Sequence, residues 1–274
     1  MLLPEGTGPL LLVGAGKMGG AMLEGWLSNG LTPDGVMVRD PSPPPEMAAL
    51  IREFQLPLNI QPDPDRPIRV IVLAVKPQMM AEVVEGVVPL AAPDTLVMSI
   101  AAGWTIANFE QYFGTSQPII RIMPNTPASI GRGMLVACPN ESVGDADRHI
   151  CNALIASSGE VAWIDDESLM DAVTGVSGSG PAYVFYLAEC LEQAGIAAGL
   201  PADLARLLAR TTVSGAGELL HSSDLGADQL RKNVTSPNGT TAAALEVLMA
   251  EGGLEDLMRE AVAAATKRSK ELSG

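Results

Sequence analysis

The sequence predicts an α/β protein in which a mostly parallel sheet, covered by helices on both faces, precedes an all-helical region. Two observations lead to this fold class. Up to residue 164, short apolar runs rich in branched residues alternate with helical patterns, and the runs lack the polar alternation of a half-exposed strand. After Asp165 the strand signals end. We therefore expect a sheet domain at residues 1–164 and a helical domain at residues 165–274.

In the first region, the opening strand at residues 10–13 leads into a helix over 16–28, where Met18, Met22 and Leu27 recur at helical spacing. The same patterns predict six further strands, at residues 36–38, 70–75, 95–100, 119–123, 133–137 and 160–164. They predict four further helices, at residues 46–54, 79–88, 106–112 and 148–157. The proline-rich stretches 41–45 and 57–67 are predicted surface loops.

The second region contains helical patterns at residues 181–195, 201–221, 229–233, 241–251 and 254–272. Pro201 suits the first position of the longest of them, because that position needs no N–H donor. Alanine and glycine are frequent here, so the helices can approach one another closely.

The composition limits the partners and the cellular compartment that we expect for this protein. The net charge of −15 argues against a nucleic-acid surface or an anionic membrane as partner, and an anionic substrate would need a local electropositive site. No signal peptide and no apolar run of about 18–20 residues is evident, so we expect no membrane span. Cys138, Cys151 and Cys190 show no pairing pattern, which favours the reducing cytoplasm, with the thiols packed as small apolar groups.

Histidines are scarce. His149 is interpreted as a surface helix residue and His221 as a residue at a helix C-terminus. No clustered His or Cys pattern predicts a metal site. A hydride transfer to a protonated carbon–nitrogen double bond needs little acid–base machinery, whereas reduction of a ketone normally needs a proton donor such as His or Lys. The scarcity of such residues therefore favours an imine over a ketone as the substrate.

The residues Gly14-Ala15-Gly16-Lys17-Met18-Gly19 match G-x-G-x-x-G between a predicted strand and a predicted helix. This context predicts a Rossmann dinucleotide site, in which Gly14 permits the turn, Gly16 admits the pyrophosphate and Gly19 lets the helix pack on the sheet. The alternative is a glycine turn with a purely structural role.

Cofactor choice depends on the end of the second strand. Asp40 lies about 20 residues beyond the glycines, where an acid bonds the ribose 2′-OH of NADH and repels the 2′-phosphate of NADPH. Arg39 could instead pair with that phosphate, and Ser42 adds a hydroxyl. Asp40 favours NADH, but the residues leave both cofactors open.

A hydroxyl-rich loop, Thr235-Ser236-Pro237-Asn238-Gly239-Thr240-Thr241, runs into a predicted helix. Free N–H groups at the start of that helix, flanked by hydroxyls, suit a small carboxylate. The alternative is an ordinary helix cap formed by Ser or Thr.

Six motifs in one order resemble the pyrroline-5-carboxylate reductase family. They are Gly14–Gly19, Ala74-Val75-Lys76-Pro77-Gln78, Ser99-Ile100-Ala101-Ala102-Gly103, Arg121-Ile122-Met123-Pro124-Asn125-Thr126-Pro127-Ala128, Thr174-Gly175-Val176-Ser177-Gly178-Ser179-Gly180-Pro181-Ala182-Tyr183, and Asn233-Val234 followed by the hydroxyl-rich loop. The resemblance implies reduction of 1-pyrroline-5-carboxylate to L-proline with NADPH or NADH, and a helical domain that forms a homodimer or a higher oligomer built from dimers.

The resemblance also implies roles for individual residues. Ala74, Val75, Lys76, Pro77, Ala101, Ala102 and Asn233 would lie along the cofactor. Backbone N–H groups around Gly239 and Thr240 would hold the substrate carboxylate, Ser236 would position substrate or nicotinamide, and the Thr241 hydroxyl would bond the ring nitrogen and relay its proton.

This sequence departs from the family pattern at two places. It has Asn238-Gly239 where the family often has Gly-Gly, and Asn tolerates the left-handed conformation such a turn needs. It has Asp40 where the family, which generally prefers NADPH, often carries Ser or Thr.

Four alternatives remain open. Lys76 could be a catalytic acid rather than the end of a strand, and the segment 177–181 could bind phosphate rather than form a bend. A 3-hydroxyacid dehydrogenase would need an acid–base lysine in the helical half, where Lys232 alone precedes residue 267. A nucleotide-binding protein without activity would have no use for the hydroxyl-rich loop.

Overall fold

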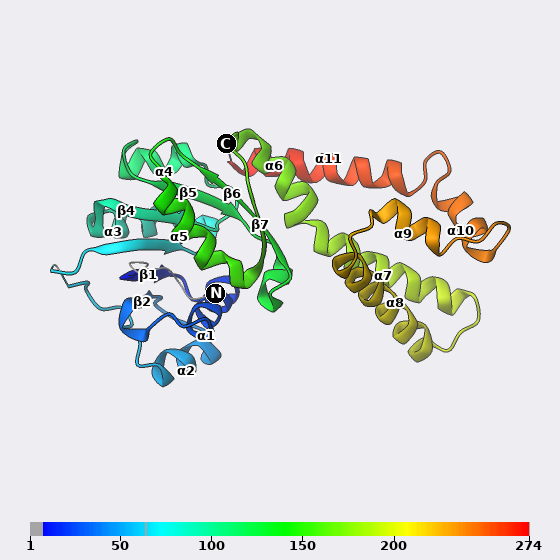
Figure 1. The fold of residues 1–274 in the computed structure, drawn as a ribbon, viewed down its shortest axis with the longest axis horizontal. Helices are drawn as coiled ribbons and strands as arrows, with labels where there is room; N and C mark the ends of the chain where they lie inside the picture. The colour runs from blue at the N-terminus through cyan, green and yellow to red at the C-terminus, as the bar shows by residue number, and fades with distance from the viewer. Residues whose placement is uncertain (1–7, 64, 274) are drawn as a thin grey trace. The chain divides into compact units, whose positions relative to one another are not determined.

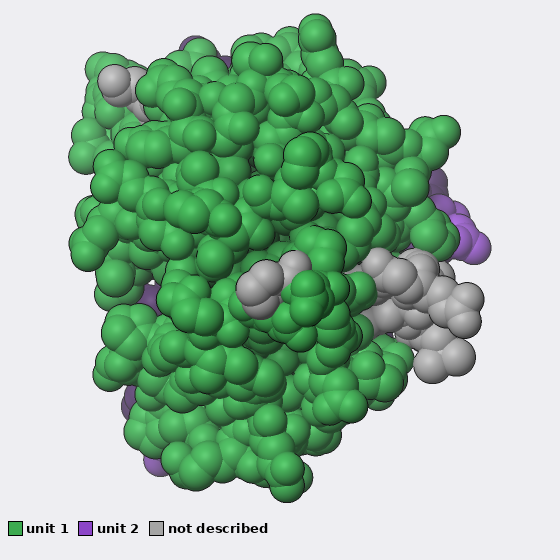
Figure 2. Space-filling model, turned by 90° about the vertical axis from the view of Figure 1, so that its left-hand side faces the viewer, with its two compact units in different colours: residues 1–178, 266–274 green, residues 179–265 purple. Residues whose placement is uncertain are grey.

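The computed structural model describes residues 8–63 and 65–273, which form two compact units (Figures 1 and 2). Unit 1 comprises residues 1–178 and 266–274, and unit 2 comprises residues 179–265. The units divide beyond the domain boundary predicted at residue 164, and the end of the last helix belongs to unit 1.

A single sheet of seven strands organises unit 1 (Figure 1). The strands are β1 (Leu10–Val13), β2 (Val36–Arg39), β3 (Ile68–Leu73), β4 (Ala91–Ser99), β5 (Ile119–Met123), β6 (Gly133–Pro139) and β7 (Gly159–Trp163). Their order is β2-β1-β3-β4-β5-β6-β7, and every neighbouring pair is parallel except β5 and β6. The predicted α/β class with a mostly parallel sheet is confirmed.

The antiparallel pair β5–β6 follows from its short connection. A parallel return needs a crossover of a dozen or more residues, whereas only the 3₁₀ turn Thr126–Ile130 and its flanking residues join these strands. Asn125 holds the turn in place, because its Oδ1 accepts from the Met134 N–H at 3.0 Å and its Nδ2 donates to the Ser177 hydroxyl at 3.3 Å.

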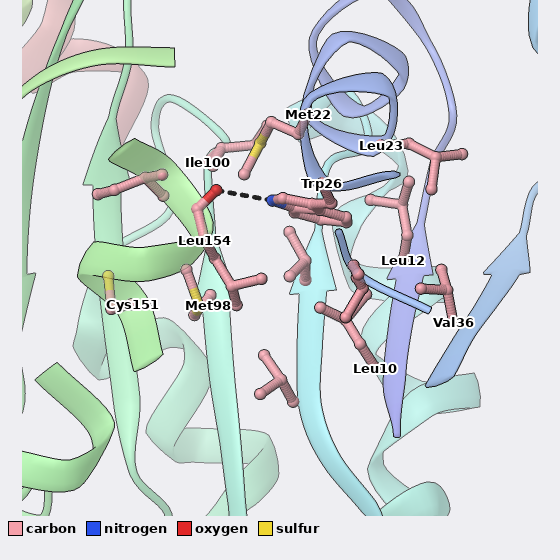
Figure 3. Packing of buried hydrophobic residues seen from close by; sticks show 14 of the residues in the cluster. Leu10, Leu12, Met22, Leu23, Trp26, Val36, Met98, Ile100, Cys151 and Leu154 are labelled. Atoms are coloured by element: carbon pink, nitrogen blue, oxygen red, sulfur yellow. Dashed lines mark hydrogen bonds between the residues drawn. The ribbon is translucent and has the colours of Figure 1, made fainter. Parts of the chain in front are cut away.

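Helices cover both faces of the sheet, and each face has its own core. On one face α1 (Lys17–Ser28), α2 (Pro45–Glu53) and α5 (Asp145–Ile155) pack on the strands, and on the other face α3 (Met80–Val87) and α4 (Ile106–Phe113) do so. Figure 3 shows the first core, where buried Trp26 of α1 donates its indole N–H to the Leu154 carbonyl of α5 at 2.6 Å. This bond ties together two helices that lie far apart in the sequence.

A short helical stretch ends the first part of unit 1. It consists of α6 (Met170–Val173), which the sequence did not predict, and a π-helical turn, Thr174–Gly178. The Ser269 hydroxyl of α11 (Leu254–Ser273) donates to Asp171 at 2.6 Å, which anchors the end of the last helix within unit 1.

Unit 2 is entirely helical. Besides the first part of α11, it contains α7 (Gly180–Ala197), α8 (Ala202–Ser222), α9 (Ala227–Asn233) and α10 (Thr240–Leu248). Helices α7 and α8 pack closely around Gly195, where an added Cβ would lie 3.2 Å from that of Ala205. Many large apolar side chains of this unit are nevertheless exposed, among them Phe185 and Leu207, each 63 % exposed.

Candidate functional site

A cavity of about 620 Å³ opens where β1, β2 and β3 end. The sheet order reverses here, because the chain places β2 on one side of β1 and β3 on the other. In open α/β sheets, ligands bind at this switch point. The cavity is lined by Val13, Gly14, Gly16, Arg39, Asp40, Pro41, Ser42, Pro44, Ala74, Val75, Lys76, Met79, Glu82, Val83 and Gly86.

The three glycines of the G-x-G-x-x-G motif each meet a different constraint. Gly14 has φ of +92°, and a Cβ there would lie 2.8 Å from the Ala74 carbonyl oxygen. A Cβ on Gly19 would lie 2.1 Å from the Gly14 oxygen, so the helix could not pack against the turn. A Cβ on Gly16 would point into open space as far as the described residues extend. Gly14 and Gly19 are therefore needed by the fold, whereas the space at Gly16 is left for a ligand.

Helix α1 begins with open N–H groups. Its N-cap residue is Gly16, and among the described side chains none caps the helix. Lys17 is exposed in the first turn, whereas Met18 packs against the core. A helix N-terminus of this kind attracts phosphate, so the segment Gly14–Gly19 fits the pyrophosphate of a dinucleotide.

Asp40 reaches back to the glycine turn. Its Oδ2 accepts from the Ala15 N–H at 2.7 Å, and its Oδ1 accepts from the Ser42 N–H at 2.8 Å. The neighbouring Arg39 donates through Nη1 to the Gly86 carbonyl at 2.9 Å. Arg39, Asp40 and Ser42 all line the cavity, and the side chains of Arg39 and Asp40 bond to different partners.

Sequence reasoning missed Asn59, which holds the backbone of Asp40. The Asn59 Oδ1 accepts from the Asp40 N–H at 2.9 Å, and its Nδ2 donates to the Asp40 carbonyl at 2.7 Å. Asn59 adopts φ of +56° in the proline-rich stretch 57–67, which bridges to Val38 of β2. An Asn in a proline-rich loop gives no sign of such a long-range clamp.

The predicted cofactor residues of unit 1 that follow β3 and β4 lie at the same edge of the sheet. Ala74, Val75 and Lys76 line the cavity, and Lys76 is exposed ahead of the 3₁₀ turn that Pro77 begins. Ala101 is buried and Ala102 exposed directly after β4, and neither lines the cavity.

The hydroxyl-rich loop lies in unit 2 between α9 and α10. Asn238 has φ of +58°, so the expectation that Asn adopts the left-handed turn is confirmed. Gly239 has φ of −83°, a conformation open to any residue. A Cβ on Gly239 would lie 2.4 Å from the Ser236 hydroxyl oxygen.

The N-terminus of α10 differs from an ordinary Ser or Thr cap. Its N-cap residue is Gly239, and no side chain within the described ranges caps the helix. Thr240 and Thr241 are the first two helical residues, with Thr240 exposed and Thr241 half-buried. The alternative reading of the loop as a hydroxyl cap is therefore wrong, and the first N–H groups of α10 remain open to an anion.

Two polar residues of α9 precede this loop. Asn233, the last residue of the helix, accepts from the Gln229 side-chain amide at 2.8 Å. Lys232 forms an ion pair with Asp228 at 2.8 Å, and this hydrogen bond lowers the pKa of Asp228. Lys232 is exposed and already paired, so the structure offers no support for an acid–base lysine in α9.

The cysteines lie in three different environments. Burial, aided by the charge of Glu167, raises the pKa of Cys138 to about 11, and burial also raises the pKa of Cys151. Both therefore pack as neutral thiols, as predicted. Cys190 is exposed on α7, so the prediction that all three thiols are packed is wrong for that residue within the described chain.

Comparison with known proteins identifies the family. Residues 167–272 match the family model described as pyrroline-5-carboxylate reductase dimerisation, and residues 10–103 match NADP oxidoreductase coenzyme F420-dependent. A pyrroline-5-carboxylate reductase from Pisum sativum is 39% identical over 95% of this chain and 94% of its own length. The chain belongs to the pyrroline-5-carboxylate reductase family.

Solved structures of pyrroline-5-carboxylate reductases support the same family assignment. The one from Coxiella burnetii is 32% identical, with a TM-score of 0.89 over 98% of this chain and 99% of its own. The Plasmodium falciparum pyrroline carboxylate reductase, solved with NADP bound, is 30% identical, with a TM-score of 0.79 over 97% of this chain and 98% of its own. The resemblance inferred from six motifs is thus confirmed along the whole chain.

Proposed function

We propose that this protein reduces 1-pyrroline-5-carboxylate to L-proline, the final step of proline biosynthesis, with NADPH or NADH as the hydride donor. The observation that carries the proposal is the N-terminus of α10, where Gly239 leaves open N–H groups beside the Thr241 hydroxyl. A helix N-terminus of this kind suits a small carboxylate. The hydroxyl beside it suits a ring nitrogen that needs one hydrogen-bond partner. Membership of the family indicates which carboxylate-bearing imine is the substrate.

The residues around the cavity of unit 1 fit a nicotinamide dinucleotide. A Cβ on Gly14, in the turn, or on Gly19, in α1, would clash with backbone atoms, and Gly16 leaves open space at the start of α1. When bound, the dinucleotide supplies a hydride for the carbon of the C=N bond. The chain contributes the pyrophosphate site at Gly14–Gly19 and the cavity wall formed by Ala74, Val75 and Lys76. We assign Pro77, Ala101, Ala102 and Asn233 to further cofactor contacts.

The hydroxyl-rich loop holds and orients the substrate. Of the N–H groups expected around Gly239 and Thr240, that of Gly239 already donates to the Ser236 carbonyl at 3.1 Å. The N–H groups of Thr240 and the next residues of α10 therefore receive the carboxylate, while the Thr241 hydroxyl bonds the ring nitrogen and relays its proton. Ser236 helps to position the substrate or the nicotinamide, and its hydroxyl oxygen lies 2.4 Å from the place that a Cβ on Gly239 would take. No strong acid such as a His or Lys side chain is required, since the protonated imine is already electrophilic.

We further propose that the protein is a homodimer, or a larger assembly of dimers, formed through unit 2. The helices of this unit expose large apolar side chains such as Phe185, Leu207 and Val247, the last 73 % exposed. Large apolar side chains exposed in such number indicate an interaction surface. The family model that matches residues 167–272 is itself described as a dimerisation region.

We propose the cytoplasm as its compartment, and the free state of Cys138, Cys151 and Cys190 accords with a reducing environment. No helix in the described part of the chain combines the length and apolarity needed to cross a bilayer. Within residues 8–63 and 65–273, no group of three or more His, Cys, Asp or Glu side chains is placed to hold a metal ion.

The test is a purified-protein assay with 1-pyrroline-5-carboxylate and each reduced cofactor. We expect cofactor oxidation that depends on the imine and yields proline in equal amount. A reaction without the imine measures background oxidation. Cofactor binding without proline formation would refute the proposed activity and leave a nucleotide-binding protein without this activity.

A further inference from the structure

We infer that Asp40 makes this chain select NADH over NADPH, contrary to the preference its family generally shows. The inference rests on the proposed function only for the use of a nicotinamide dinucleotide. It depends on three features of unit 1: how the Asp40 carboxylate is held, how its backbone is held, and which charges border the cavity.

The carboxylate of Asp40 is fixed at the glycine turn. The Ala15 N–H donates to Oδ2 at 2.7 Å, and the Ser42 N–H donates to Oδ1 at 2.8 Å. Each oxygen has a further lone pair for a ribose hydroxyl. An acid at the end of β2 accepts from the ribose 2′-OH, whereas a 2′-phosphate in the same place would meet a like charge.

The backbone of Asp40 cannot move away from this place without losing two more hydrogen bonds. Asn59 binds both the N–H and the carbonyl of Asp40, at 2.9 and 2.7 Å. The loop that carries Asn59 is itself joined to β2, because the Asn59 N–H donates to the Val38 carbonyl at 2.9 Å. Rearranging the turn to admit a phosphate would therefore disrupt the edge of the sheet.

The positive charge of Arg39 does not offset the negative charge of the Asp40 carboxylate. Its Nη1 donates to the Gly86 carbonyl at the end of α3, so the guanidinium is engaged along the other wall of the cavity. The charged residues that line the cavity are Arg39, Lys76, Asp40 and Glu82, two of each sign. With a chain charge of −15, neither the cavity nor the protein supplies an excess of positive charge for the extra phosphate of NADPH.

The test is the affinity of the whole protein for each cofactor, measured by titration calorimetry without substrate. We expect NADH to bind at least about tenfold more tightly than NADPH, since one like-charge contact of this kind suffices for that ratio. Asp40→Asn and Asp40→Ser should each lower the ratio by about tenfold or more, chiefly by tightening NADPH.

Glu82→Gln is the matched control, because it removes one negative charge from the same cavity away from the glycine turn. It should change the ratio by less than about threefold, as expected for a screened charge at a distance. A wild-type protein that binds NADPH more tightly, or a ratio that is the same in both Asp40 variants as in the wild type, would overturn the inference. Because no substrate is present, these results are independent of proline formation.

Discussion

Two helices of this protein begin in the same way but differ in what surrounds them. Both α1 and α10 start after an extended glycine, Gly16 with φ of −70° and Gly239 with φ of −83°, and neither is capped by a described side chain. Before α1, glycines and the carboxylate of Asp40 surround the open N–H groups. Before α10, the surrounding groups are the hydroxyls of Ser236 and Thr241.

The difference shows how one backbone feature serves two anions. A pyrophosphate is bulky and needs backbone alone around it, so a site for it excludes Cβ atoms. A small carboxylate next to an imine leaves room for hydroxyls that contact the reacting ring. The residue with positive φ differs in the same way between the two turns. In the turn before α1 it is Gly14, which has no side chain, and in the turn before α10 it is Asn238, which has one.

The largest effect should come from Gly19→Ala. Its Cβ would lie 2.1 Å from the Gly14 oxygen, a backbone atom that cannot move without opening the turn. We expect a loss of about 2–3 kcal/mol in the free energy of unfolding and loss of measurable cofactor binding. Thermal unfolding and calorimetry check both.

Gly16→Ala is the control for that prediction. Its Cβ meets open space in the described chain, so the variant should keep wild-type stability while binding cofactor more weakly. If both variants are equally stable and bind cofactor alike, the different roles given to these glycines are incorrect.

Gly239→Ala should affect the second turn alone. The added Cβ would lie 2.4 Å from the Ser236 hydroxyl oxygen, which has to rotate away, and 3.2 Å from the Ser236 carbonyl oxygen, so the backbone before α10 shifts slightly. We expect KM for 1-pyrroline-5-carboxylate to rise by about tenfold, the value of one charge-assisted hydrogen bond. Steady-state kinetics measures KM, and an unchanged cofactor affinity confirms that unit 1 is intact. Wild-type KM would show that the carboxylate binds elsewhere.

Thr241→Ala tests the hydroxyl that we place at the ring nitrogen. We expect turnover to fall by about 10–100-fold, equivalent to roughly 1.4–2.7 kcal/mol, with cofactor affinity nearly intact. Thr241→Ser keeps the hydroxyl and should restore most of the rate. Normal turnover in the alanine variant would remove Thr241 from the mechanism.

The smallest effect concerns Asn238 at φ of +58°. Alanine there should cost about 1 kcal/mol through backbone strain, whereas glycine should cost almost nothing. Thermal unfolding of the two variants compares them directly. Equal stability would mean that the turn is free to relax.

Local patterns were enough to predict most of the fold. The strands, most of the helices and the G-x-G-x-x-G turn follow from apolar spacing and from glycines at fixed positions. The boundaries of α10 were less accurate, because Ser, Thr and Gly can all cap a helix and the sequence does not say which one does. In the structure the cap is Gly239, and the helix ends at Leu248 rather than at residue 251.

The contacts that could not be predicted are long-range ones between polar side chains. Asn59 clamps Asp40 across 19 residues, and Ser269 binds Asp171 across 98. Neither residue belongs to a motif, and each pairing depends on the folded path of the chain. The preference for NADH could likewise be suggested by Asp40 in the sequence but argued only once its partners Ala15, Ser42 and Asn59 were known.

The most direct test of the account compares kcat/KM for 1-pyrroline-5-carboxylate and for 1-pyrroline, which lacks the carboxylate. If the N-terminus of α10 binds that carboxylate, the wild-type protein should favour 1-pyrroline-5-carboxylate by about 100-fold or more, and Gly239→Ala should lower that advantage by about tenfold. Similar kcat/KM for the two imines, or an advantage that is undiminished in Gly239→Ala, would contradict it.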